Sequence, residues 1–122
     1  ESWSTHFLKS LEKCCLYVCD HLSTTFIESL TAEKPTLLFW DFDANPLRSE
    51  AQPFYDALYS VGILHGSPES AANYLNSIYD NVISWCDSPK CLKVRREFCH
   101  QFGRTSPNAI QEWAEEFKKM VA

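Results

Sequence analysis

A polar turn between two apolar runs holds the residues best suited to chemistry. Residues 15–19 have the pattern of a short buried strand, and His21 and the hydroxyl residues Ser23, Thr24 and Thr25 follow it before a helical pattern begins. Free backbone N–H groups and the positive end of a helix dipole attract phosphate, and hydroxyls add donors. Ligands of open α/β sheets bind at this kind of strand end. The turn therefore indicates a phosphate or pyrophosphate site.

The same turn also has a purely structural explanation. Thr25 and Glu28 have the spacing of a capping box, in which the two side chains satisfy backbone N–H groups at the start of a helix without any ligand. His21 is placed either to contact a phosphate or to pack. Spacing alone leaves these alternatives open.

A second candidate is the pair Asp41 and Asp43, which follows the apolar run 36–40. The pair looks like the first motif of haloacid-dehalogenase-type phosphatases, in which one Asp attacks a phosphate and the other acts as acid and base around Mg²⁺. That family continues with Gly-Thr, whereas this chain has Ala44 and Asn45. The spacing also fits the metal-binding Asp-x-Asp found in one class of glycosyltransferases. Two solvated carboxylates in a loop explain the pair more simply than either function.

Cysteine and histidine residues near the C-terminus contain the atoms that zinc prefers. Cys86, Cys91, Cys99 and His100 are widely spaced, however, and lack the two-residue gap of a zinc knuckle, so we expect no metal site. The chain has six cysteines, and we expect reduced thiols that pack as small hydrophobic groups rather than disulfides.

The elements that would position the turn form a βαβ unit. The apolar runs 15–19 and 36–40 are separated by a helical stretch that carries Phe26, Ile27 and Leu30. A crossover helix between two strands requires a parallel pair. A helix over 3–13, with Trp3 on its apolar face, precedes the unit; a helix over 50–61 and a short strand over 62–65 follow it.

The C-terminal half is predicted to be helical and to wrap around the sheet. Three Ser-Pro pairs, at 67–68, 88–89 and 106–107, each offer an N-cap hydroxyl followed by proline at the first helical position. The third start precedes an apolar face of Ile110, Trp113, Phe117 and Met120.

Bulk composition narrows the function classes. The chain has 122 residues, 45% of them hydrophobic, which is enough for one domain with a core, and its net charge of −5 makes nucleic acid an improbable partner. No run approaches the ~20 apolar residues of a membrane span. We expect a soluble cytoplasmic protein, located in the cytosol or at the inner face of the membrane.

The run 16–40 resembles the late βαβ unit of glycosyltransferases with two Rossmann-like domains, the GT-B type. It is most similar to the C-terminal region of a family of bacterial surface-carbohydrate transferases, related at this turn to Kdo and polyglycerol-phosphate transferases. The likeness covers nearly the whole chain and continues through 48–58, 61–65, 67–72, 95–99 and 104–106. The chain departs from that family at 41–44, where an Asn-Pro-rich segment is usual, and at Cys86, where a second Trp is common.

The resemblance implies an α/β fold with a partial Rossmann-like domain: a short parallel sheet with a βαβ unit, then a mostly helical C-terminal half. Residues 1–122 would be a single incomplete domain, the C-terminal part of a donor-binding domain. Ser23, Thr24 and Thr25 would hold the donor phosphates, and Glu28 would reach the ribose or cap the helix.

The implied function is transfer of a sugar from a nucleotide-sugar donor to a surface polysaccharide or glycolipid acceptor. A mechanism without a metal or other cofactor is favoured, because a helix end and hydroxyls can replace the cation. An N-terminal acceptor domain would lie outside these residues, so the isolated chain should be a poor enzyme. The alternative is a non-catalytic α/β module that binds a partner.

Overall fold

A three-stranded parallel sheet organises the chain. The structure is a computed structural model that describes residues 6–122, so Trp3 lies outside the described residues. The strands β1 (Tyr17–Cys19), β2 (Thr36–Phe39) and β3 (Leu64–His65) lie in the order β1-β2-β3. Tyr17 pairs with Thr36, and Leu38 pairs with Leu64. The α/β class and the βαβ unit predicted from the sequence are confirmed.

Helices connect the strands and continue beyond them. A short helix, α1 (Phe7–Lys13), precedes β1; α2 (Thr24–Thr31) joins β1 to β2, and α3 (Gln52–Ser60) joins β2 to β3. The C-terminal half consists of four α-helices and one 3-10 turn, which confirms that this half is helical. These are α4 (Pro68–Ile78), η1 (Tyr79–Asn81), α5 (Val82–Cys86), α6 (Pro89–Phe102) and α7 (Ala109–Val121).

Two of the three predicted Ser-Pro helix starts are confirmed. The hydroxyls of Ser67 and Ser88 cap α4 and α6 by accepting hydrogen bonds from the backbone N–H groups of Ser70 and Cys91. The third start is shifted, because residues 107–108 form a turn and α7 begins only at Ala109.

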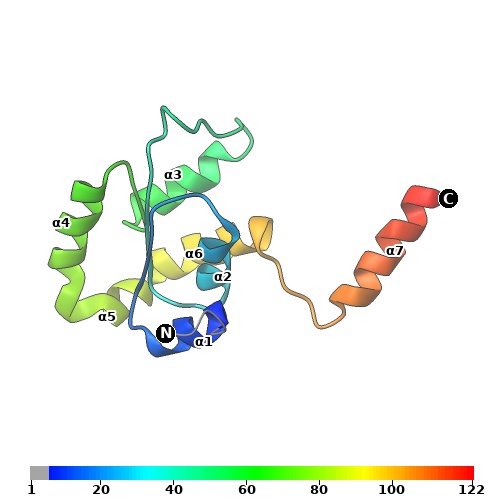
Figure 1. Cartoon of the computed structure of the whole chain (residues 1–122), viewed down its shortest axis with the longest axis horizontal. Helices are drawn as coiled ribbons and strands as arrows, with labels where there is room; N and C mark the ends of the chain where they lie inside the picture. Colours follow the sequence, from blue (N-terminus) through cyan, green and yellow to red (C-terminus); the bar gives the residue numbers. More distant parts are fainter. Residues whose placement is uncertain (1–5) are drawn as a thin grey trace.

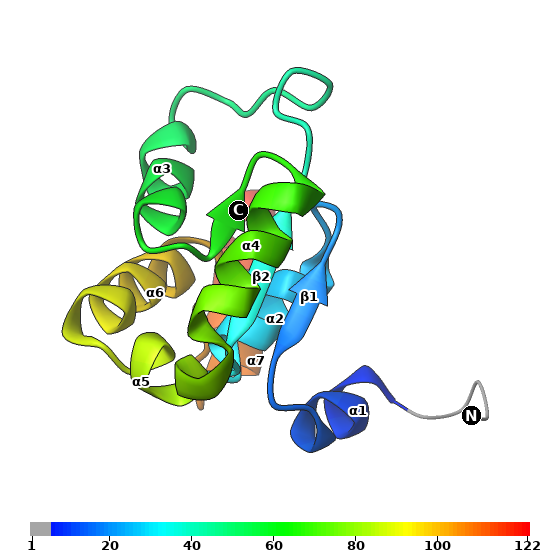
Figure 2. The same cartoon turned by 90° about the vertical axis from the view of Figure 1, so that its left-hand side faces the viewer.

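The sheet separates two layers of helices. Figure 2 shows α4 in front of the sheet and α2 behind it. Both faces of the central strand are covered, since Leu37 and Leu38 are both buried. An aromatic cluster fills the space between the sheet and the helices behind it. The ring centroid of Phe98 on α6 lies 5.9 Å from that of Phe26 and 5.2 Å from that of Tyr55. This cluster holds α2, and with it the polar turn, against the rest of the domain.

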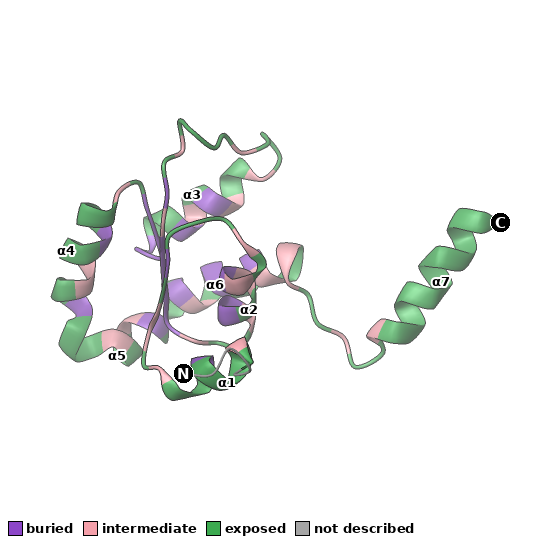
Figure 3. Cartoon of the chain, in the orientation of Figure 1, coloured by how far each residue is buried: buried purple, intermediate pink, exposed green. Residues whose placement is uncertain are grey.

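The last helix does not join this core. In Figure 1, α7 stands apart from the sheet at the end of an extended segment that follows α6, and Figure 3 shows it exposed along its length. The prediction that all C-terminal helices wrap around the sheet is therefore wrong for α7. Its apolar residues form a face, as their spacing predicts, but no element within residues 6–122 covers that face. The exposed face is made by Ile110, Trp113, Phe117 and Met120.

Candidate functional site

The carboxyl ends of the three parallel strands lie at one edge of the sheet. The polar turn 20–23 follows β1, the loop with Asp41 and Asp43 follows β2, and Gly66 follows β3. The turn connects directly to the N-terminus of α2. The sequence-based placement of the turn at this edge is thus confirmed.

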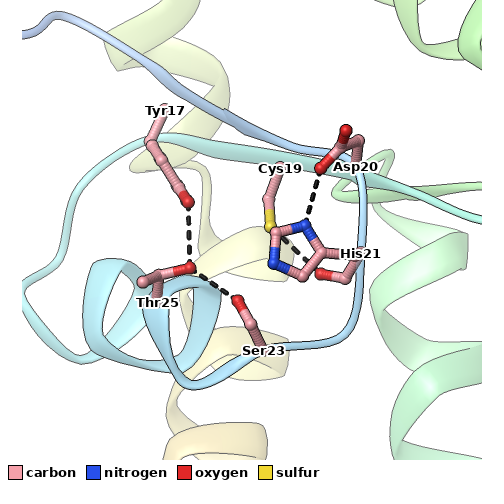
Figure 4. A network of polar contacts seen from close by, with 6 residues as sticks. All are labelled: Tyr17, Cys19, Asp20, His21, Ser23 and Thr25. Carbon is pink, nitrogen blue, oxygen red and sulfur yellow. Dashed lines mark hydrogen bonds and ion pairs between the residues drawn. The ribbon is translucent and has the colours of Figure 1, made fainter.

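A chain of three hydroxyl groups crosses the turn (Figure 4). The Tyr17 hydroxyl donates to Thr25 Oγ1 at 3.0 Å, and Thr25 Oγ1 lies 2.6 Å from Ser23 Oγ. Burial raises the pKa of Tyr17, which keeps its phenol protonated as a donor. Because Thr25 accepts from Tyr17, it can donate its own proton to Ser23. The Ser23 hydroxyl is then free to donate to a ligand.

The N-terminus of α2 is not capped by a side chain. Ser23 is the N-cap residue, yet its hydroxyl makes no cap hydrogen bond, in contrast to Ser67 and Ser88 on α4 and α6. Backbone N–H groups of the first turn are therefore left for other acceptors. The capping-box interpretation of Thr25 and Glu28 is wrong, because the helix begins at Thr24 and the Thr25 hydroxyl is engaged by Tyr17 and Ser23.

His21 is held by its neighbours in the turn. Its Nδ1 lies 2.6 Å from Asp20 Oδ1, and its backbone oxygen accepts a hydrogen bond from the Cys19 thiol at 3.0 Å. The hydrogen bond to His21 lowers the pKa of Asp20. Nδ1–H is therefore the donor toward the carboxylate, and Nε2 remains for a ligand. Both side chains are exposed to solvent.

The remaining predicted residues stand apart from this network. Thr24 is the first residue of α2 and is exposed. Glu28 lies one helical turn further along α2 with an exposed side chain, and none of the hydrogen bonds found within residues 6–122 involves its carboxylate. The structure thus brings Ser23 and Thr25 together, pairs His21 with Asp20, and leaves Thr24 and Glu28 outside both contacts.

Sequence reasoning did not assign a role to Tyr17 or Asp20. Tyr17 lies two residues before Cys19, and side chains two apart in a strand point to the same face. Cys19 is buried, whereas Val18 between them is 46% exposed. The sequence itself shows no polar–apolar alternation here, so the orientation of the Tyr17 hydroxyl became visible only in the structure.

The Asp41 carboxylate stabilises the loop that follows β2. Its Oδ1 accepts hydrogen bonds from the backbone N–H groups of Asp43 and Ala44 at 2.9 and 3.3 Å, the contacts of an Asx-type turn. Both aspartates are exposed. This geometry supports the explanation of the pair as a solvated loop.

The four residues Cys86, Cys91, Cys99 and His100 do not gather into one group that could hold zinc, within the part of the chain that the structure describes. Thr31 Oγ1 contacts Cys99 Sγ at 3.9 Å, and His100 is exposed. In the described part of the chain, no three His, Cys, Asp or Glu side chains are grouped to hold a metal ion.

His65 at the end of β3 ties the sheet to α4. Its Nε2 donates to the backbone oxygen of Gly62 at 2.9 Å, so its Nδ1 accepts from the Ser70 hydroxyl at 2.9 Å. Burial lowers the pKa of His65. Both ring nitrogens are used internally, which makes this histidine a structural residue of the edge rather than part of the polar turn.

The fold and the turn define the chain as a parallel α/β domain with an uncapped helix N-terminus at the carboxyl edge of its sheet. Residues 1–117 match the model of the LIC12162 family transferase, and the chain therefore belongs to this family of transferases. Comparison with curated proteins and with solved structures found no match. None of the helices within residues 6–122 has the length and apolar character needed to cross a membrane.

Proposed function

We propose that the chain supplies the donor-diphosphate subsite of a GT-B-type glycosyltransferase. The enzyme would move a sugar from a nucleotide-sugar donor to a surface polysaccharide or glycolipid, in the cytosol or at the inner face of the membrane. The transferase family supports the reaction class. The observation that carries the site is Ser23: it occupies the N-cap of α2 without capping it and ends a hydroxyl chain anchored by Tyr17.

The proposed reaction is attack of an acceptor hydroxyl on the anomeric carbon with departure of the nucleoside diphosphate. Negative charge develops on that diphosphate, and the α2 N–H groups and the Ser23 hydroxyl stabilise it. Nε2 of His21 adds a donor when the ring is protonated, and Thr24 adds a hydroxyl. Glu28 on the next turn reaches toward the ribose. No metal is required in this scheme, and the acceptor domain, with the catalytic base, lies outside these residues.

The test is a titration of the chain with inorganic pyrophosphate, in which binding is detected by changes in the NMR chemical shifts of the backbone amides. We expect the backbone amides of residues 23–26 to shift on titration. The double variant Ser23→Ala with Thr25→Val should weaken this binding about tenfold, because hydrogen bonds to a charged group contribute about 1.5–3 kcal/mol each. Ser67→Ala is the matched control, since that serine caps α4 in the ordinary way; it should leave pyrophosphate affinity unchanged.

Two results would contradict the assignment. Equal affinity for the double variant and the unmodified chain would show that the hydroxyl chain does not bind phosphate. Shifts confined to other amides would place the anion elsewhere.

A non-catalytic interaction module is the second candidate, favoured by the exposed apolar face of α7. It predicts no pyrophosphate shifts at residues 23–26. The phosphatase alternative predicts Mg²⁺-dependent release of phosphate that is lost in Asp41→Asn. We expect no such release, because Asp41 already accepts two backbone N–H groups of its own loop.

A further inference from the structure

A buried arginine lies behind the sheet. Arg95 on α6 is 4% exposed, and an arginine keeps its positive charge at all ordinary pH values. None of the ion pairs found within residues 6–122 includes it. Its Nη1 donates to the backbone oxygen of Glu33 at 3.3 Å and to Cys86 Sγ at 2.8 Å.

Cys86 is the group in contact with this guanidinium that can carry a negative charge. A buried charge is stable only when it is paired. The backbone oxygen of Glu33 supplies a partial charge, whereas the Cys86 sulfur can ionise fully. Cys86 is itself 3% exposed, so solvent does little to screen the attraction between thiolate and guanidinium. The pair therefore joins the end of α5 to α6, and Arg95 also contacts the turn that follows α2.

The side chain of Cys91, in the first turn of α6, contacts that of Cys86 at the end of α5. Hydrogen bonding by Cys91 and the charge of Arg95 lower the pKa of Cys86 to about 7, while burial and the carboxylate of Asp87 oppose them. The pKa of Cys91 is raised, first by its contact with Cys86 and then by burial. Cys86 is therefore the thiol of the pair that loses its proton more readily. Both residues are free thiols.

We infer that Cys86 and Cys91 form a redox-active dithiol that reacts with hydroperoxides, with Cys86 as the attacking thiolate and Cys91 as the resolving thiol. The Cys86 sulfur attacks one oxygen of hydrogen peroxide, the O–O bond breaks, and hydroxide leaves, which gives a sulfenic acid. The Cys91 thiol loses its proton, attacks that sulfur and expels its oxygen as water. The two sulfurs are oxidised by two electrons, which the peroxide accepts.

A surface pocket borders the resolving thiol Cys91, but Cys86 is not among its lining residues. Cys91 lines a surface pocket of about 420 Å³ together with His65, Tyr74 and Lys90. Hydrogen peroxide is little larger than water and enters such a space readily. Arg95 is in the lining of a second pocket.

Thiolate formation is tested by ultraviolet thiolate absorbance as a function of pH. We expect a step for one thiol with its midpoint at about 7. The step should be lost in Cys86→Ser and moved to higher pH in Arg95→Lys, which keeps a charge but not the guanidinium geometry. Loss in Cys99→Ser instead, or an unchanged midpoint in Arg95→Lys, would overturn the pairing of Cys86 with Arg95.

Disulfide formation is tested by peroxide treatment, alkylation with iodoacetamide and tryptic mass spectrometry. Trypsin places Cys86, Cys91 and Cys99 in three peptides, 49–90, 91–93 and 97–104. We expect the first two to become linked, and Cys86 to oxidise about tenfold faster than Cys99, whose pKa burial raises. In Cys91→Ser, Cys86 should stop at the sulfenic or sulfinic acid. Oxidation of Cys86 no faster than Cys99, or absence of the linked peptide, would overturn the inference.

Discussion

Helices α6 and α7 have similar sequence patterns, but α6 packs into the core and α7 does not. They have 14 and 13 residues, and each follows a Ser-Pro pair and carries an apolar face. Cys91, Val94 and Phe98 of α6 are buried, whereas the corresponding face of α7 is exposed. Helical periodicity thus predicts an apolar face but not whether another element covers it. Stability should therefore depend strongly on α6 and hardly at all on α7.

Phe98→Ala should have the largest effect. Phe98 is 1% exposed and contacts the rings of Phe26 and Tyr55, so its removal leaves a cavity under α2. We expect the free energy of unfolding to fall by about 3–5 kcal/mol, measured by denaturant unfolding followed by circular dichroism. Phe117→Ala is the matched control on α7. Equal losses in the two variants would contradict the contrast between the helices.

Ser88→Ala should have an intermediate effect. The Ser88 hydroxyl accepts the Cys91 N–H at the start of α6, and loss of such a cap costs about 1 kcal/mol. Ser23→Ala removes no cap from α2 and should destabilise the chain less. Thermal melting of both variants measures the difference. A larger loss for Ser23→Ala would mean that its hydroxyl serves the fold rather than a ligand.

Acid should destabilise the packed domain through His65. Burial lowers the pKa of His65 in the folded state below its ordinary value of 6.5, so the unfolded state binds more protons just below that pH. The free energy of unfolding should therefore fall as pH drops from about 6.5 through the folded-state pKa. His65→Asn should flatten this part of the profile. Asp20, whose pKa is lowered from 3.8, acts in a separate window at lower pH. A slope that is unchanged in His65→Asn would assign the effect to another group.

Trp113→Ala should have the smallest effect. Trp113 is 64% exposed and its ring contacts Phe117 on the same helix. Surface substitutions of this kind change stability by no more than about 0.5 kcal/mol. Denaturant unfolding of the variant should superimpose on that of the unmodified chain. A loss above about 1 kcal/mol would mean that α7 packs on another surface in solution.

Much of the fold was predictable from local patterns. The apolar runs before Asp20 and Asp41 fall on β1 and β2, and the Ser-Pro pairs at 67–68 and 88–89 fall on real helix starts. These signals are local, because strand periodicity and capping chemistry involve residues close in sequence. The third Ser-Pro pair was misleading, since Ser106 turns its hydroxyl to Glu112 and α7 begins later.

The candidate site was predicted only in part. The sequence located the turn and its hydroxyls, but it left open a capping box of Thr25 and Glu28 that does not form. The direction of the hydrogen bonds among the hydroxyls depends on Tyr17 of β1. The orientation of the Tyr17 side chain is set by packing against α2. The pairing of Arg95 with Cys86 likewise joins residues that no motif connects.

The order of elements, the parallel βαβ unit and the position of the polar turn at a strand end were determined by the sequence alone, because hydrophobic periodicity and crossover geometry leave few alternatives. Only the tertiary structure decided that Ser23 leaves α2 uncapped, that Arg95 is buried against a thiol and that α7 stands free. The physical reason is that these properties depend on which side chains and backbone groups pack together and are thereby removed from water. That exclusion is set by contacts between residues distant in the chain.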